Sequence, residues 1–221
     1  MAGDYDAFWI PGPDDFDMDA ALQAGGRWLA RAPYTGRKVV VLHAKKMLTN
    51  RRTLQDLSAF HVVSPNARDI PYGNAGGVLA VWPGAPELEL AMDLARGNGL
   101  CVIPNRYDIA WWIAQSGASN LIAPDEAAPT LAALPDEAVQ ILNSIVRFGG
   151  HNSFLGGGEK EDAVADLRRL HGIQPTLSGE AIEQHILASG ETDAAGARRI
   201  RDWWETIRSG GGLRDYRGRS I

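Results

Sequence analysis

Residues suited to ligand contact follow four short apolar runs of this chain. They are His43, Lys45 and Lys46 after the first run, Ser64, Asn66 and Arg68 after the second, Trp82 and Gly84 after the third, and Asn105 and Arg106 after the fourth. Lysine and arginine pair with phosphate oxygens, and a tryptophan ring offers a plane on which a base can stack. The set therefore predicts a site for a nucleotide or nucleoside-like ligand, although loops of any α/β domain are rich in polar residues.

A second candidate is the segment 149–158, which holds five glycines together with His151 and Asn152 between two helical patterns. Glycines before a helix are typical of phosphate-binding loops, because the unpaired N–H groups at a helix start attract anions. Three acids within residues 159–162 occupy that start here and would repel a phosphate. The sequence leaves two interpretations open, a glycine-capped hinge between helices and a loop whose histidine and asparagine contact a ligand.

Residues 77–104 run in the order strand, turn, helix, Gly-Asn-Gly and strand. In this order they resemble a segment of the nucleoside deoxyribosyltransferase-like proteins, in which a helical Glu attacks or stabilises the anomeric carbon as an N-glycosidic bond breaks. The resemblance implies that Glu89 takes the catalytic role. Glu89 also shares a helical stripe with Asp93 and Arg96, which is typical of a solvated face. Glu87, nearer the turn, could point toward the strand ends or stabilise the helix start.

The C-terminal region favours a different function. Residues 180–188 and 193–208 give two helical patterns joined by a turn, with the length and spacing of a helix-turn-helix. Arginines that would neutralise a nucleic-acid backbone lie on the second helix and in the tail, at Arg198, Arg199, Arg201, Arg214, Arg217 and Arg219. A third alternative is a protein-interaction module in which Trp203 and Trp204 contact a partner. Whether the protein is an enzyme therefore stays open.

A parallel sheet would bring the residues after the four apolar runs to one edge. The runs lack polar alternation, as expected for strands covered on both faces, and they span residues 39–43, 60–63, 78–82 and 100–103. Helical patterns lie between them, at residues 18–33, 86–95 and 108–115, with Gly25 and Gly26 as a weak point of the first. The predicted fold class is α/β, a small Rossmann-like parallel sheet of about four strands with flanking helices, followed by an all-helical C-terminal unit.

Shifts in composition predict five segments. They are an acidic N-terminal segment 1–17, a Rossmann-like domain 18–122, a Pro- and Ala-rich linker 123–134, a helical domain 135–208 and a basic flexible tail 209–221. The helical domain has no strand signals, and Pro135 with two acids after it makes a favourable first turn.

The chain of 221 residues is 45% hydrophobic and carries a net charge of −5, which is typical of a globular protein. Its apolar runs are far shorter than the roughly 20 residues that span a bilayer, so we expect no membrane partner. Cys101 is the only cysteine and no secretory signal is evident, which favours a cytoplasmic location. The histidines show no zinc spacing, so we expect neither a metal site nor a cofactor, and the oligomeric state stays open.

Overall fold

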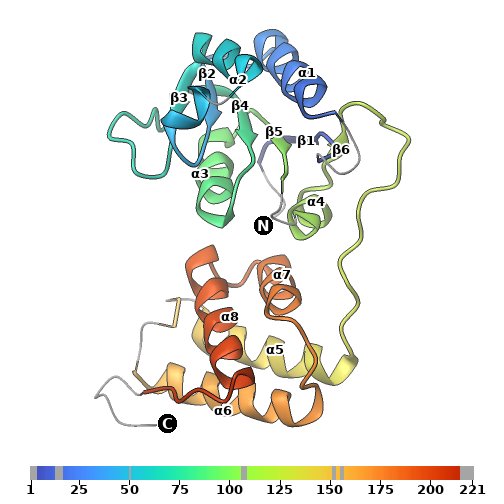
Figure 1. The fold of residues 1–221 in the computed structure, drawn as a ribbon, viewed down its shortest axis with the longest axis vertical. Helices are drawn as coiled ribbons and strands as arrows, with labels where there is room; N and C mark the ends of the chain where they lie inside the picture. Colours follow the sequence, from blue (N-terminus) through green and yellow to red (C-terminus); the bar gives the residue numbers. More distant parts are fainter. Residues whose placement is uncertain are drawn as a thin grey trace. The chain divides into compact units, whose positions relative to one another are not determined.

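The computed structural model describes residues 4–12, 17–49, 51–105, 109–150, 153–154 and 157–214. The chain divides into two compact units, Met1–Pro129 and Thr130–Ile221. Their boundary lies inside the segment 123–134 that the sequence predicts as a linker. Figure 1 colours the α/β unit from blue to green and the helical unit from yellow to red.

The α/β unit is built around a six-stranded sheet. The strands are β1 (Asp6–Trp9), β2 (Arg37–Val41), β3 (His61–Val63), β4 (Ala75–Val81), β5 (Gly99–Ile103) and β6 (Ser119–Asn120). Their spatial order is β3-β2-β4-β5-β1-β6, and every neighbouring pair is parallel. The predicted α/β class with a parallel sheet is confirmed, and the predicted number of about four strands is corrected to six.

The two additional strands, β1 and β6, carry weak sequence signals. β1 pairs with β5 on one side and β6 on the other, so the acidic segment 1–17 contributes an interior strand of the sheet. Only the last of its four residues, Trp9, is buried, and β6 has only two residues. A buried parallel strand is recognised by an apolar run of four to eight residues. β6 offers none, and at β1 the run Ala7–Ile10 has only the minimum length and stands between Asp6 and Pro11 in an acidic segment.

Helices cover both faces of the sheet. They are α1 (Met18–Arg31), α2 (Arg52–Asp56) between the 3₁₀ turns η1 (Lys45–Thr49) and η2 (Leu57–Ala59), α3 (Ala85–Ala95) and α4 (Ala110–Ser116). The chain crosses the sheet in one direction from β1 to β2 and in the other from β4 to β5. Because such crossovers are right-handed, their helices lie on opposite faces. Figure 1 shows α1 and α2 on one face and α3 and α4 on the other.

Helix α1 approaches the sheet closely at Gly25. A Cβ atom at this position would lie 2.9 Å from side-chain atoms of both Leu79 and Ile103. These two residues belong with Leu22 and Leu29 to the buried core between α1 and the sheet. From the sequence we expect Gly25 to weaken the helix, but α1 is continuous through this residue. The glycine instead lets the helix backbone approach the strands.

The C-terminal unit is helical, as predicted. It consists of α5 (Asp136–Gly149), α6 (Gly157–Ile173), α7 (Gly179–Ser189) and α8 (Ala194–Arg208). Fully buried apolar side chains from all four helices form its core, at Leu142, Leu167, Leu170, Ile186, Ile200 and Trp204. Side chains cap two of the helix starts: Ser178 accepts a hydrogen bond from the N–H of Ala181, and Asp193 accepts one from the N–H of Gly196.

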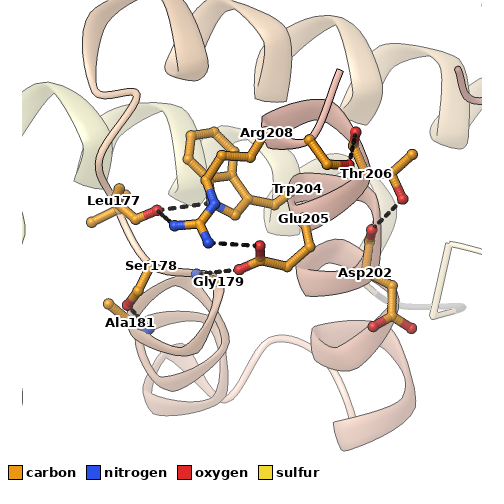
Figure 2. Close-up of polar contacts among 10 residues, drawn as sticks. Leu177, Ser178, Gly179, Ala181, Asp202, Trp204, Glu205, Thr206 and Arg208 are labelled. Atoms are coloured by element: carbon orange, nitrogen blue, oxygen red, sulfur yellow. Dashed lines mark hydrogen bonds and ion pairs between the residues drawn. The ribbon is translucent and has the colours of Figure 1, made fainter. Parts of the chain in front are cut away.

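The turn before α7 is held by side chains of α8 (Figure 2). Trp204 Nε1 donates to the carbonyl of Leu177 at 3.0 Å, and Glu205 accepts a hydrogen bond from the N–H of Gly179 at 3.0 Å. The second carboxylate oxygen of Glu205 lies 3.0 Å from the guanidinium of Arg208. Side chains of α8 thus form hydrogen bonds with backbone groups of the turn and of the start of α7, and these bonds fix α7 against α8.

Candidate functional site

The carboxyl ends of β2 and β4 flank a reversal in the strand order. From β2 the chain continues outward to β3, whereas from β4 it continues in the opposite direction to β5. In open parallel sheets, ligands bind in the crevice that such a reversal opens beyond the carboxyl ends of the strands. Two of the predicted groups of residues, the one after β2 and the one after β4, therefore meet at the position where this fold class holds its ligands.

A histidine and a buried glutamate pair across this reversal. His43 Nδ1, two residues beyond β2, lies 2.9 Å from Oε1 of Glu87 on α3. The side chain of His43 is 75% exposed and that of Glu87 is 6% exposed. An ionised carboxylate can only accept hydrogen bonds, so Nδ1 carries the hydrogen and Nε2 of a neutral ring is the basic nitrogen. The pair thus holds an accessible imidazole in one tautomer.

Local sequence explains the position of Glu87. Helix α3 begins after Gly84, with a proline in its first turn, and Glu87 is its third helical residue. Oε2 of Glu87 accepts a hydrogen bond from the N–H of Gly84 at 2.9 Å, which is one half of a capping box. One oxygen of the carboxylate therefore caps the helix while the other orients His43.

Trp82 follows β4 in a strained backbone conformation. Its φ of 52° lies in the left-handed region, which a bulky residue rarely adopts. Its N–H donates to the carbonyl of Ile103 at 2.8 Å, and its Nε1 donates to the sulfur of Met18 at 3.0 Å. These bonds hold the partly buried indole at the carboxyl edge. Strain of this kind is concentrated at functional sites, where the surrounding structure maintains it.

The predicted cations of the first two groups lie in exposed segments. Lys46 and Arg68 are exposed, and Lys45 Nζ lies 3.5 Å from the carboxylate of Asp69. The pKa of Asp69 is lowered, chiefly by a hydrogen bond from its own backbone and next by the charge of Lys45. Asp69 also accepts at its carbonyl from His61 Nε2 at 3.0 Å. Lys45 is thus partly neutralised, which leaves Lys46 and Arg68 as the less constrained cations.

The remaining predicted residues of this edge differ in how they are placed. Ser64, which directly follows β3, is partly buried, whereas Asn66 and Asn105 are exposed. Gly84 contributes its N–H to the cap of α3. Arg106 lies outside the described residues.

Glu89 lies two positions after Glu87 on α3, so their side chains project from nearly opposite sides of the helix. Glu89 is partly buried. Asp93 and Arg96, which share its stripe, form an exposed ion pair at 2.7 Å. The catalytic role that the resemblance implies for Glu89 stays a prediction. The glutamate that contacts His43 is Glu87, and the pattern of a glycine cap followed three residues later by Glu was the sequence signal for its position.

The described part of the glycine-rich segment packs within the helical unit. The Phe154 ring lies where a Cβ of Gly149 would be, and its edge contacts Trp203 with ring centroids 6.1 Å apart. Ser153 Oγ donates to Asp193 at 2.7 Å. The Phe154 ring thus gives Gly149 a packing role. His151 and Asn152 lie outside the part of the chain that the structure describes.

The arginines predicted to contact nucleic acid are unequally available. Arg201 donates to the carboxylate of Glu183 at 2.7 Å, and this carboxylate, with a side chain only 1% exposed, raises the pKa of the guanidinium. Arg199 donates to the carbonyl of Ser153. Arg198 and Arg214 are exposed, whereas Arg217 and Arg219 are outside the described ranges. Two of the three helical arginines thus stabilise their own unit.

Comparison with known proteins provides no match. No protein-family model matches the chain, and it has no significant match among curated proteins or solved structures. Within the described ranges no group of three or more His, Cys, Asp or Glu side chains is placed to hold a metal ion. The helices described there are all too short or too polar to cross a bilayer.

Proposed function

We propose that the α/β unit binds a nucleotide or nucleoside-like ligand at the carboxyl edge of its sheet, between the ends of β2 and β4. The observation that carries this proposal is the 2.9 Å contact between exposed His43 and buried Glu87 at the reversal of strand order. A carboxylate removed from water is costly unless it is well paired, and here its pairing holds an imidazole open to solvent.

The surroundings of the pair suit such a ligand. Trp82 is fixed at the end of β4 and offers an aromatic ring for a base. The exposed cations Lys46 and Arg68 lie on the segments after β2 and β3, the neighbouring strands on one side of the reversal. A phosphate would pair with these two side chains directly, whereas at Lys45 it would compete with the carboxylate of Asp69, 3.5 Å from Nζ. The single buried thiol of Cys101 suits the cytoplasmic location that belongs to this proposal.

Ligand binding is tested by thermal unfolding in the presence of adenosine, adenosine 5′-monophosphate and NAD. A ligand at about 100 times its Kd stabilises the native state by about 2.7 kcal/mol, which raises Tm by several degrees. We expect the rise to be lost in His43→Ala and reduced by the pair Lys46→Glu and Arg68→Glu. A matched charge reversal at Arg96, on the outer stripe of α3, should leave it unchanged. No rise with any of the ligands would refute the proposal.

The His43–Glu87 pair also favours a second proposal, cleavage of an N-glycosidic bond. In such a step the bond between the anomeric carbon and the base nitrogen breaks, and its electron pair leaves with the base. A protonated His43 would donate a proton to the base, and water would add to the anomeric carbon and lose a proton. Glu87 would act by holding the imidazole in position.

Release of free base from adenosine tests this reaction, because adenine needs a proton as it leaves. We expect Glu87→Gln to lower the rate by about 100-fold or more, because general acid–base catalysis contributes 10²–10⁴-fold. Glu89→Gln tests the assignment that the resemblance implies, and a comparable loss there would give Glu89 the catalytic role. If the unmodified protein binds nucleoside but releases no base, the binding proposal stands and the reaction is excluded.

A further inference from the structure

A groove separate from the carboxyl edge lies between helix α1 and the segment after β6. Its volume is about 430 Å³, and it is lined by Ala24, Arg27, Trp28, Arg31, Ala32, Pro33, Leu121 and Ile122. Cavities of roughly 300–1,000 Å³ hold small-molecule ligands in proteins. We propose that this groove binds a small amphipathic carboxylate, with its acid group on the two arginines and its apolar body on Trp28 and Ile122. This inference does not depend on the proposed function.

The floor of the groove is apolar and fixed. Trp28 packs on Phe8 of the interior strand β1, with ring centroids 5.7 Å apart. The backbone N–H of Leu121 donates to the carbonyl of Trp9 at 2.8 Å, which ties the other wall to the same strand. Ile122 is 37% exposed, one of the few large apolar side chains of the described chain that face solvent to this extent. An apolar ligand would therefore meet a preformed surface.

The rim of the groove is cationic. Arg27 and Arg31 are four residues apart on the exposed side of α1, so their side chains are neighbours on the helix. Neither guanidinium has an ion pair or hydrogen bond with a residue that the structure describes. Two acids follow the other wall, and neither lines the groove: Asp125 is exposed, and Glu126 accepts a hydrogen bond from Asn120 at 2.8 Å. Two like charges at this spacing disfavour the helix by a few tenths of a kcal/mol, and an anion between them would reverse the effect.

The geometry restricts the chemical class of the ligand. Guanidinium groups bind planar carboxylates through paired hydrogen bonds. The wall residues Pro33, Leu121 and Ile122 offer no side-chain hydrogen-bond partner for a polar body. A carboxylate with an alkyl or aromatic body satisfies both parts of the groove.

The arginines of the groove lie further along α1 than the residue that contacts the carboxyl edge. Met18, which contacts Trp82 at that edge, begins α1, and the two arginines are Arg27 and Arg31. Nine and thirteen residue steps at 1.5 Å each place them about 14 and 20 Å from Met18 along the helix axis. A ligand bound at the arginines of the groove would therefore not contact a ligand at the carboxyl edge, and binding at each site can be measured separately.

Isothermal titration calorimetry with sodium octanoate tests the proposal on the full chain, with octan-1-ol as the neutral ligand of equal chain length. We expect octanoate to bind, and octanol to bind at least tenfold more weakly. The double variant Arg27→Gln/Arg31→Gln should weaken octanoate binding at least tenfold, and Ile122→Glu should do the same by placing an acid beside the ligand. The single variant Arg52→Gln, at an exposed arginine of α2, is the matched control and should bind as the unmodified protein does.

Three results would overturn the inference. The first is no heat of binding with octanoate, and the second is equal binding of octanoate and octanol. The third comes from a parallel sedimentation assay with phosphatidylglycerol vesicles. If the arginine variant abolishes vesicle binding while octanoate does not bind at all, the groove recognises a lipid surface and not a small carboxylate.

Discussion

At the scale of single residues, Glu87 connects the helix cap to the chemistry of the carboxyl edge. Its two oxygens accept from His43 and from the N–H of Gly84, both at 2.9 Å. The sequence identifies both His43 and Glu87 as residues of interest, but it does not pair them. Their contact joins residues 44 positions apart and depends on β2 lying beside β4, which is information that local patterns do not contain.

Tyr34 gives a residue-scale prediction for pH. Its hydroxyl donates to Asp6 at 2.7 Å, and burial, followed by the hydrogen bond and charge of Asp6, raises the pKa of the phenol to about 12. The unfolded phenol ionises near 10, so the folded state retains the proton between these values. The stability that Tyr34 contributes is complete below about pH 10 and is lost as the pH rises through 12.

Ultraviolet titration of phenolate absorbance measures this shift. We expect the protein to show a tyrosine that ionises near 12 and is missing from the titration of Tyr34→Phe. The variant should also lose less stability than the unmodified protein between pH 10 and 12. A Tyr34 that ionises at 10 in the folded protein would contradict the assigned contact with Asp6.

At the scale of elements, the strands that the sequence predicts are those with unbroken apolar runs. β4 and β5 are buried throughout, and the valines that end β2 are buried after an exposed Arg37 and a partly buried Lys38. β1 escapes prediction because its short apolar run, Ala7–Ile10, lies among acidic residues and prolines, and its place beside β5 is set by long-range pairing. The longer helices are predicted because an apolar stripe and a cap are local features. The five-residue helix α2 is too short to show such a stripe, and the sequence does not predict it.

Gly25 provides a prediction for the packing of α1. Alanine normally stabilises a helix interior by up to about 1 kcal/mol relative to glycine. Its Cβ here would lie 2.9 Å from Leu79 and Ile103, so we expect Gly25→Ala to lower the free energy of unfolding by about 1–2 kcal/mol. Urea unfolding monitored by circular dichroism measures the change.

Gly172 in α6 is the matched control for this substitution. No atom lies within 4 Å of a Cβ built there, so Gly172→Ala should be neutral or stabilising. If Gly25→Ala raised the free energy of unfolding as much as Gly172→Ala does, α1 would not approach the sheet as described.

At the scale of the whole molecule, the α/β unit and the helical unit each have a buried core, and a segment without helix or strand connects them. Residues 123–134 contain no helix or strand and are largely exposed. Segments of this kind are preferred sites of proteolysis, whereas paired or packed backbone resists it. The proposed ligand site and the proposed carboxylate groove both belong to the α/β unit.

Limited proteolysis with an enzyme that cleaves after glutamate tests this organisation. We expect early cleavage at Glu126 to give two fragments that resist further digestion, identified by intact-mass spectrometry. Glu183, buried in α7, is the internal control and should remain uncut while the unit is folded. Cleavage at Glu183 before Glu126 would contradict the two-unit organisation.

The most direct test of the ligand site is the NMR signal of the His43 imidazole during titration with adenosine 5′-monophosphate, assigned with His43→Ala. We expect this signal to shift to saturation while the signals of His171 and His185 in the helical unit stay in place. An unchanged His43 signal in a protein that binds the nucleotide would place the ligand elsewhere and refute the proposed site between β2 and β4.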